Sequence, residues 1–358
     1  MNTKKRIIYR GYQFCTEIWI KGIAFRAFRQ GRIDSKWRQI LCRVAEDFPS
    51  VHTYKMIRGF LDDRIILKKK AVSWQDRSTP TVVCVEKDSM AFLKNFLPYY
   101  RNMGVRHFVF IDNGSGDGTE QFLMGQEDVT LYSAPWPFEH RRKSGWLLQA
   151  IEETGTDRWY LRLDSDEFLT WEGMETSSLR QLVADMKKAG LRALRGVMLD
   201  MYPSYDLLDV SRDDSGFMEE YCWFDDGTSF RTDPSTGEIF GGMRFRTTGA
   251  YLRMDKYMLF HPGRGCVPVT SHDVTGLEKT QMQQACHCVL RHYKFLPSEA
   301  EKYRNISQNP DSGYSAYKQV SKYAGIVDKN VSAYSSEHSV QYESSHSLRA
   351  LKLISPLP

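Results

Sequence analysis

The sequence predicts an α/β fold, with a mostly parallel sheet flanked by helices and a basic helical extension in front of it. Three observations predict this fold. Short apolar runs alternate with helix-like stretches from residue 81 onward, acidic turns follow two of these runs, and positive charge is concentrated before residue 70. Strands that alternate with helices form parallel sheets through right-handed crossovers.

The first 70 residues hold 17 Lys or Arg and six Asp or Glu, a net charge of +11, against +5 for the whole chain of 358 residues. Apolar residues are interleaved with the basic ones, which is more typical of a helix on an anionic membrane surface than of a nucleic-acid-binding tail. A helical extension packed on the main domain, with its charges solvated, is the other interpretation. No nucleic-acid partner is expected.

A change of pattern near residues 70–80 predicts three parts: a basic helical extension over 1–75, an α/β domain over 76–310 and a C-terminal tail over 311–358. No run of 18 apolar residues is present, and the first residues lack the apolar core and cleavage site of a secretory signal. The seven cysteines are scattered and odd in number, as expected of reduced thiols. We therefore expect a cytoplasmic protein, either free or peripheral at the inner face of the membrane.

The elements of the α/β domain follow from periodicity and turn residues. Apolar runs predict strands over 81–85, 107–111, 129–132, 159–163 and 195–201, with a last pair near 258–260 and 288–293. Helices are expected from Met90, capped by Asp88 or Ser89 and kinked or shortened by Pro98, and over 145–153 and 297–306. Residues 203–250 have no clear period and are expected to be irregular.

Two acidic turns follow predicted strands. Asp164 and Asp166 stand one residue apart after an apolar strand, where both can face one divalent cation and neutralise a diphosphate; a plain surface turn is the alternative. Asp112 opens the second turn, in which Gly114, Gly116 and Gly118 allow close approach of a ligand to the backbone. Ligands bind beyond the carboxyl ends of parallel strands, so both turns are expected to border one crevice.

Several other motifs are excluded by single positions. A dinucleotide-binding fingerprint would need Gly in place of Thr119, an EF-hand would need Glu in place of Leu123, and no phosphate-binding P-loop pattern occurs. A dehalogenase-type phosphatase would need Thr in place of Phe168. Cys286-His287-Cys288 lacks the second ligand pair of a zinc site.

The chain resembles bacterial family-2-like glycosyltransferases of GT-A fold from about residue 81 to 354. The resemblance rests on motifs that occur in one order: 85–88 (Val-Glu-Lys-Asp), 112–119, 164–168, 241–246 (Gly-Gly-Met-Arg-Phe-Arg), 271–272 and 291–295 (Arg-His-Tyr-Lys-Phe). It implies a nucleotide-sugar donor and a saccharide or lipid-linked acceptor, as in envelope or extracellular polysaccharide or glycolipid synthesis. It also implies sugar transfer that inverts the anomeric centre.

The resemblance also implies roles for particular residues. Glu86, Lys87, Asp88, Asp112 and Asn113 would hold the nucleoside, Asp164 would lie near the ribose and the metal, and Asp166 and His292 would bind the metal. An imidazole beside carboxylates favours Mn²⁺, or Mg²⁺ at lower affinity. Without the resemblance, His292 is expected to be a core histidine on a strand.

Three arginines and several carboxylates complete the predicted site. Arg142 follows the third strand and would meet the diphosphate or lie on a solvated face, whereas Arg244 and Arg246 stand beside glycines that open backbone room. The general base for the acceptor hydroxyl is sought among Asp225, Asp226, Asp255 and Asp273, with Asp225 preferred because Trp223 and Phe224 precede it. A nucleotidyl- or phosphotransferase and a non-catalytic nucleotide-sugar-binding module are the competing functions.

Overall fold

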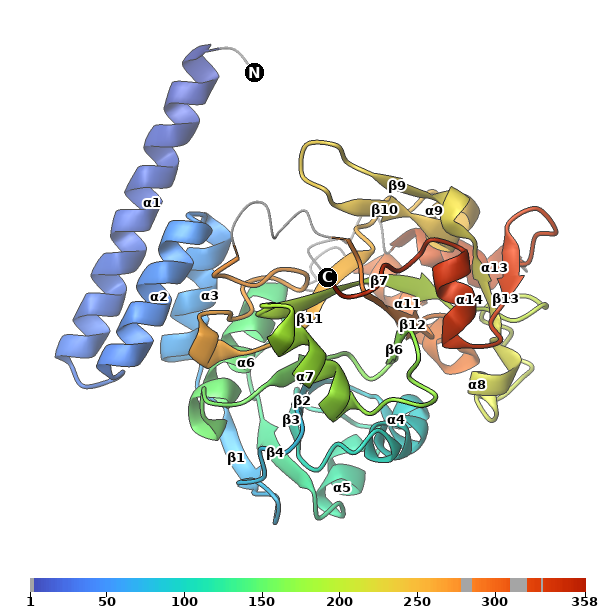
Figure 1. Cartoon of the computed structure of the whole chain (residues 1–358), viewed down its shortest axis with the longest axis horizontal. Helices are drawn as coiled ribbons and strands as arrows, with labels where there is room; N and C mark the ends of the chain where they lie inside the picture. Colours follow the sequence, from blue (N-terminus) through green and yellow to red (C-terminus); the bar gives the residue numbers. More distant parts are fainter. Residues whose placement is uncertain (1–2, 278–284, 310–320, 330) are drawn as a thin grey trace.

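The computed structural model describes residues 3–277, 285–309, 321–329 and 331–358 (Figure 1). Within this part of the chain, the centre of the molecule is a nine-stranded mixed sheet of order β1-β4-β3-β2-β5-β11-β7-β12-β6. In that order the strands are β1 (Ile66–Lys69), β4 (Val129–Ser133), β3 (Phe108–Asp112), β2 (Thr81–Glu86), β5 (Tyr160–Arg162), β11 (Asp255–Phe260), β7 (Ala193–Asp200), β12 (Cys288–His292) and β6 (Glu167–Trp171).

The parallel part of the sheet carries the predicted acidic turns. Strands β4, β3, β2 and β5 are parallel neighbours, and β7 is parallel to β12. The pairs β1–β4, β5–β11, β11–β7 and β12–β6 are antiparallel. The α/β fold with a flanked sheet and a basic helical extension is confirmed.

Helices cover both faces of the sheet because its buried strands alternate their side chains between two cores. Val82 and Cys84 of β2 belong to one core, together with apolar residues of α4 (Met90–Asn102), α5 (Thr119–Met124) and α7 (Leu179–Lys188). Val83 and Val85 belong to the other, together with residues of α6 (His140–Thr154) and of the N-terminal helices. Strand β2 is therefore buried along its whole length.

Three helices form the N-terminal extension, namely α1 (Thr3–Arg29), α2 (Ser35–Asp47) and α3 (Val51–Asp62). Asp34 and Ser50 cap α2 and α3 by accepting hydrogen bonds from the backbone N–H groups of Trp37 and Thr53. Helix α3 packs so closely on α6 that a Cβ atom at Gly145 would lie 2.8 Å from a backbone nitrogen of α3. Figure 1 shows α1 on the outside of this group, with α2 and α3 between it and the sheet.

The later part of the chain surrounds the β7–β12 end of the sheet. It contains α8 (Phe217–Glu220), β8 (Trp223–Asp225), β9 (Phe230–Thr232), β10 (Ile239–Gly241), α9 (Gly242–Thr248), α11 (Ala300–Gln308), α13 (Ala324–Lys329), β13 (Ser339–Gln341) and α14 (Ser345–Ala350). Short 3-10 turns lie at Gly227–Ser229, Pro262–Arg264, Pro297–Glu299 and Ser321–Tyr323. Residues 203–250 were expected to be irregular, but they contain the short elements α8, β8, β9, β10 and α9. Strand β13 pairs with β8, so part of the predicted C-terminal tail packs against this region.

Three local expectations differ from the structure. The helix expected over 145–153 begins five residues earlier, at His140, which places Lys143 in its first turn. Neither Asp88 nor Ser89 caps α4 with its side chain, because Asp117 Oδ2 accepts the N–H of Met90 at 2.9 Å. Helix α4 continues through Pro98 to Asn102 without the expected shortening.

Candidate active site

The two acidic turns lie at the carboxyl ends of neighbouring strands. Glu86 at the end of β2 is paired in register with Asp112 at the end of β3, and β5 on the other side of β2 leads into the turn that holds Asp164 and Asp166. Ser165 Oγ donates a hydrogen bond of 2.8 Å to Glu86 Oε2. This hydrogen bond connects the turn that holds Asp164 and Asp166 to the carboxyl end of strand β2.

Asp112 and Asn113 shape their own turn. The carboxylate of Asp112 is buried and accepts hydrogen bonds from the backbone N–H groups of Gly114 and Ser115 and from the Ser115 hydroxyl. The Asn113 amide donates to the carbonyl oxygens of Ala134 and Trp136, each at 2.8 Å. Both side chains hold the loop in position, so a ligand there would meet mainly the glycine-rich backbone.

Asp88 locks the loop after β2 to the loop after β3. Its Oδ1 accepts the N–H of Gly116 at 2.7 Å, and its own N–H donates to Ser115 Oγ at 2.8 Å. Asp88 adopts a left-handed backbone conformation with φ of 53°, which Asp tolerates better than most residues. Lys87, beside it, is exposed.

Asp164 is held ionised by lysines that sequence reasoning did not assign to it. Lys143 Nζ lies 2.6 Å from Asp164 Oδ1, and the N–H of Asp164 donates to Glu167 Oε2. Burial opposes ionisation of the Asp164 carboxyl, but Lys143 and Lys256 outweigh it and keep its pKa well below the usual value. A small pocket beside Asp164 is also lined by Lys143 and Lys256.

Asp166 faces His292, the last residue of β12, which pairs with β6 directly after Asp166. Asp166 Oδ2 lies 3.2 Å from His292 Nε2 and 3.3 Å from Lys294 Nζ. Burial opposes ionisation of Asp166, but Lys294 and His292 outweigh it and lower its pKa well below the usual value. Asp166 Oδ1 is buried and has no hydrogen-bond partner among the described residues.

Asp200 orients the histidine from the other side. Its Oδ1 lies 2.7 Å from His292 Nδ1, and its Oδ2 accepts from Arg244 Nε at 2.7 Å. Burial lowers the pKa of His292, but the carboxylates of Asp166 and Asp200 outweigh it and raise the pKa above its usual value. An Nδ1–H donated to Asp200 would leave Nε2 of a neutral His292 free for a ligand.

A divalent cation would be held by Asp166 and His292. Among residues 3–277, 285–309, 321–329 and 331–358, no three His, Cys, Asp or Glu side chains form a ready-made metal cluster. However, a hard cation that also binds phosphate needs only one or two protein carboxylates. The unpartnered Oδ1 of Asp166 and the His292–Asp200 pair fit such a cation.

Glu86, in contrast to Asp164 and Asp166, has a raised pKa. It is 5% exposed, its Oε2 accepts from the hydroxyls of Ser89 and Ser165, and its Oε1 has no partner in the described part of the chain. Burial, with the Asp164 charge added, raises the pKa of Glu86 to about 7. Strongly shifted carboxyls with an unpartnered oxygen are typical of ligand sites.

The four predicted base candidates have different environments. Asp273 is partly buried, and both of its oxygens bind Arg253. Asp225 is 2% exposed, and both of its oxygens bind Arg246, at 2.6 and 3.0 Å. Asp255 is fully buried and binds Arg195 and Arg253. Asp226 is only partly buried, and its Oδ1 accepts from the N–H and hydroxyl of Thr228.

The predicted arginines all bind carboxylates. Arg142 turns away from Asp164, with its Nε 3.1 Å from Asp63 Oδ2 of the N-terminal extension and its Nη1 donating to the carbonyl of Pro137. Arg244 and Arg246 of α9 bind Asp200 and Asp225. In this geometry it is Lys143, the neighbour of Arg142, that reaches Asp164.

Glu167 and Lys256 form another pair that sequence reasoning missed. Lys256 Nζ lies 2.6 Å from Glu167 Oε2, and both side chains are buried. The two residues are 89 positions apart in the chain, so no local sequence motif predicts their contact. The one local signal was Glu167 itself, directly after Asp166.

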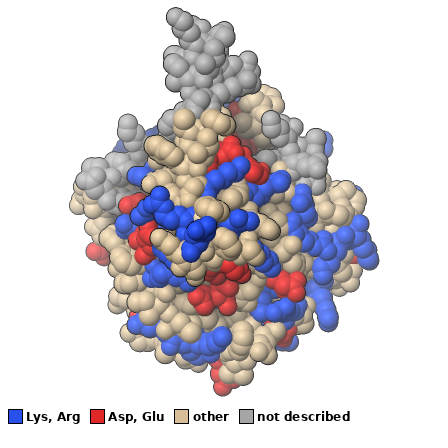
Figure 2. Space-filling view, turned by 90° about the vertical axis from the view of Figure 1, so that its left-hand side faces the viewer, with Lys and Arg blue, Asp and Glu red and all other residues tan. Residues whose placement is uncertain are grey.

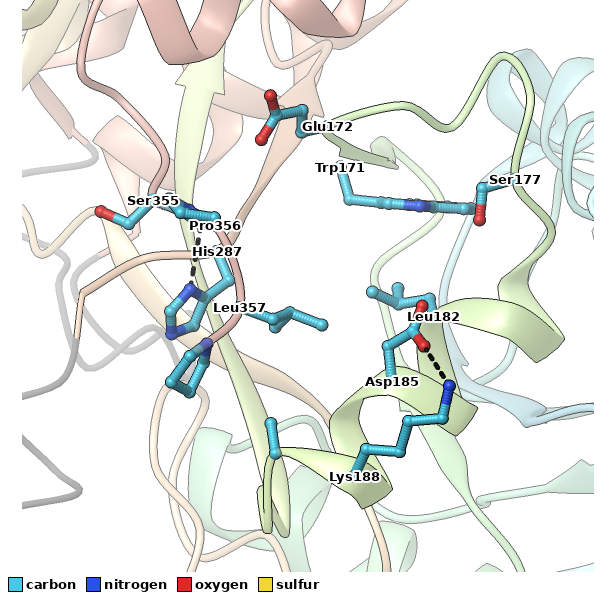
Figure 3. Close-up of a pocket in the computed structure, with 12 residues that line it drawn as sticks. Trp171, Glu172, Ser177, Leu182, Asp185, Lys188, His287, Ser355, Pro356 and Leu357 are labelled. Atoms are coloured by element: carbon cyan, nitrogen blue, oxygen red, sulfur yellow. Dashed lines mark hydrogen bonds and ion pairs between the residues drawn. The ribbon is translucent and has the colours of Figure 1, made fainter.

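A further pocket lies away from these residues. It has a volume of about 460 Å³ and is bordered by Trp171, α7 and the C-terminal residues 355–358 (Figure 3). His287 Nδ1 is 3.0 Å from the carbonyl oxygen of Ser355 at its wall. None of the predicted site residues lines this pocket.

No family model matches the chain. It is 29% identical over 108 residues to a glycosyltransferase family 92 protein of rice (Oryza sativa subsp. japonica), a match that covers 29% of this chain and only 18% of that protein. Two solved structures of HddC from Yersinia pseudotuberculosis also align with it. The one complexed with GMP-PN is 8% identical, with a TM-score of 0.27, and covers 51% of this chain and 72% of its own.

The second HddC structure is 10% identical, with a TM-score of 0.26, and covers 57% of this chain and 79% of its own. Neither TM-score is high enough to support an argument. The match to the rice protein spans less than a fifth of that protein, so it does not show the family of this chain.

Proposed function

We propose that this protein is a metal-dependent glycosyltransferase that moves a sugar from a nucleotide-sugar donor to an acceptor hydroxyl. The observation that carries the proposal is the buried, unpartnered Oδ1 of Asp166 beside His292, whose other ring nitrogen is held by Asp200. The similarity to a glycosyltransferase of rice supports the same reaction class.

The charges around Asp164 and Asp166 nearly balance without a ligand. Five carboxylates and four Lys or Arg side chains gather there, besides His292: Glu86, Asp164, Asp166, Glu167 and Asp200 against Lys143, Lys256, Lys294 and Arg244. A diphosphate would add negative charge that these lysines cannot offset alone. A bound Mn²⁺ or Mg²⁺ would supply the missing positive charge and stabilise the departing diphosphate.

The chain's own residues would hold the donor. The nucleoside of the donor would lie against the glycine-rich backbone after Asp112 and the carboxyl of Glu86. The diphosphate would approach Asp164, where Lys143 lies. Lys143 and Lys294 would exchange part of their carboxylate contacts for phosphate oxygens. Asp200 would keep His292 in the tautomer that presents Nε2.

The acceptor hydroxyl needs a base, and transfer by single displacement would invert the anomeric centre. Of the four predicted carboxylates, Asp226 is partly exposed and binds no arginine among the described residues. Both oxygens of Asp225, Asp255 and Asp273 bind arginines. We therefore favour Asp226 as the base over Asp225. The acceptor would be a saccharide or a lipid-linked saccharide.

The test is a donor-hydrolysis screen with UDP-, GDP- and CDP-sugars, with and without Mn²⁺ or Mg²⁺. Wild type is compared with Asp166→Asn and with Asp213→Asn, an exposed aspartate in a surface turn that serves as the matched control. We expect metal-dependent release of nucleoside diphosphate by wild type and the control, and a loss of at least about 100-fold in Asp166→Asn.

Other outcomes would contradict the proposal in distinct ways. Release of free phosphate without nucleoside diphosphate would indicate a phosphotransferase. Metal-dependent donor binding without turnover, even with saccharide acceptors, would indicate a non-catalytic module. Equal turnover by Asp166→Asn and wild type would remove Asp166 from the metal site.

A further inference from the structure

Helix α1 has an apolar stripe on its outer side. Phe14, Ile18 and Phe25 are 63%, 50% and 50% exposed, and their spacing of four and seven residues places them on one line along the helix. Trp19 is 67% exposed and points about 100° further round the helix than Ile18, with its ring centroid 6.4 Å from that of Tyr54 in α3. Isolated exposed apolar residues are ordinary, but a line of large ones on a single helix marks an interaction surface.

The opposite side of α1 is already occupied. Thr16, Ile20, Ala24 and Ala27 are buried and repeat with helical spacing, and the apolar ones belong to the core shared with α2, α3 and α6. The stripe is therefore not the face that attaches α1 to the rest of the chain. Figure 1 shows that α1 is the outermost element on its side of the molecule.

The charge of this region indicates the kind of partner. Residues 1–70 carry a net charge of +11, and Arg26 and Arg29 are exposed in the last turn of α1, with Arg29 four residues after Phe25. The side of the molecule that Figure 2 faces carries many Lys and Arg side chains, with smaller groups of Asp and Glu between them. Anionic lipids attract such basic segments with about 1 kcal/mol per residue near the surface.

We propose that the outer face of α1, formed by Phe14, Ile18 and Phe25, docks on an anionic phospholipid surface. Trp19, Arg26 and Arg29 would lie at the edge of this face, among the headgroups. Aromatic and aliphatic side chains of a helix that lies in the interface sink below the headgroups while flanking cations stay among them. A second copy of the chain fits less well, because pairing α1 with α1 would bring two strongly basic segments together. No helix in the described residues is long and apolar enough to cross a bilayer. The proposal does not depend on the reaction.

The test measures co-sedimentation of the full chain with vesicles of phosphatidylcholine alone and of phosphatidylcholine with 30% phosphatidylglycerol. We expect binding to the anionic vesicles that weakens at high salt. A Phe14→Ser/Ile18→Ser/Phe25→Ser variant should bind at least about tenfold more weakly, since three large apolar side chains no longer enter the bilayer. A matched control carries Val72→Ser and Val210→Ser, two exposed apolar positions outside α1.

Two further measurements keep the test decisive should the triple variant fold poorly. Arg26→Glu/Arg29→Glu should also bind at least about tenfold more weakly. Brominated lipids should quench wild-type fluorescence more than that of Trp19→Phe. Absence of wild-type binding, equal binding by the charge variant, or identical quenching with and without Trp19 would overturn the proposal. A change from dimer to monomer in the triple variant, with no vesicle binding by wild type, would assign the stripe to self-association instead.

Discussion

Replacing Glu86 with glutamine should change how the stability of the protein depends on pH. Burial and the Asp164 charge raise the pKa of Glu86 from 4.5 to about 7. Between these values the folded protein holds a proton that the unfolded chain has released, so wild-type stability falls as pH rises. At about 1.4 kcal/mol per pKa unit, the full effect is about 3 kcal/mol, of which about 2.5 kcal/mol falls between pH 5 and pH 8.

Glutamine keeps the local hydrogen bonds. Oε2 of Glu86 accepts from the hydroxyls of Ser89 and Ser165 at 2.6 and 2.8 Å, and the carbonyl oxygen of a carboxamide can accept both. The substitution therefore removes the titrating group with little change in packing. Other ionisable groups are common to both proteins and largely cancel in the difference.

The assay is urea unfolding of wild type and Glu86→Gln at pH 5, 6, 7 and 8. The free energy of unfolding of wild type minus that of Glu86→Gln should fall by about 2.5 kcal/mol over this range. Glu127→Gln, at an exposed position, is the control and should run parallel to wild type. A difference between wild type and Glu86→Gln that stays constant within about 0.5 kcal/mol would refute the reasoning that burial disfavours the Glu86 charge.

Three further substitutions test packing, metal binding and the base. Gly145→Ala places a Cβ 2.8 Å from backbone of α3 and should lower the free energy of urea unfolding by about 1–3 kcal/mol, whereas Gly22→Ala in α1 has open space and should be neutral or stabilising. Asp200→Asn, which weakens the hold on His292 Nδ1, should lower Mn²⁺ affinity about 10–100-fold by calorimetry; unchanged affinity would exclude a role in orienting the ligand. Asp225→Ala leaves the partly buried Arg246 without its carboxylate and should lower the free energy of unfolding, measured with urea or heat, by about 3 kcal/mol. A loss of activity with unchanged stability would instead favour Asp225 as the base.

The sequence alone predicted that the candidate site lies at the edge of the sheet formed by the carboxyl ends of the parallel strands. Apolar runs and turn residues are local signals, and each of the predicted strands from residue 81 to 163 is present in the sheet. Since parallel strands place their carboxyl ends at one edge, the order of strands and acidic turns was enough to bring Glu86, Asp112 and Asp164 to neighbouring strand ends.

The sequence could not predict what each side chain contacts there. Asp88 holds the neighbouring loop rather than capping its own helix, and Arg142 binds Asp63 while Lys143 reaches Asp164. Whether Arg142 or Lys143 faces Asp164 depends on where α6 begins and on the rotation of α6 about its own axis. One residue along a helix rotates a side chain by about 100°, so a boundary error of a few residues reverses which cation faces the site.

Composition and helical spacing determined that the chain begins with a basic helical extension, although residues 66–69 form strand β1 of the sheet and not a helix. The order of apolar runs determined the α/β sheet with its acidic edge. Only the tertiary structure decided which side of α1 is buried, that Asp200 holds His292 against Asp166, and that Lys256 binds Glu167. The physical reason is distance along the chain. These contacts join residues about 90 to 130 positions apart, and such pairs form only when separate strands are packed into one sheet.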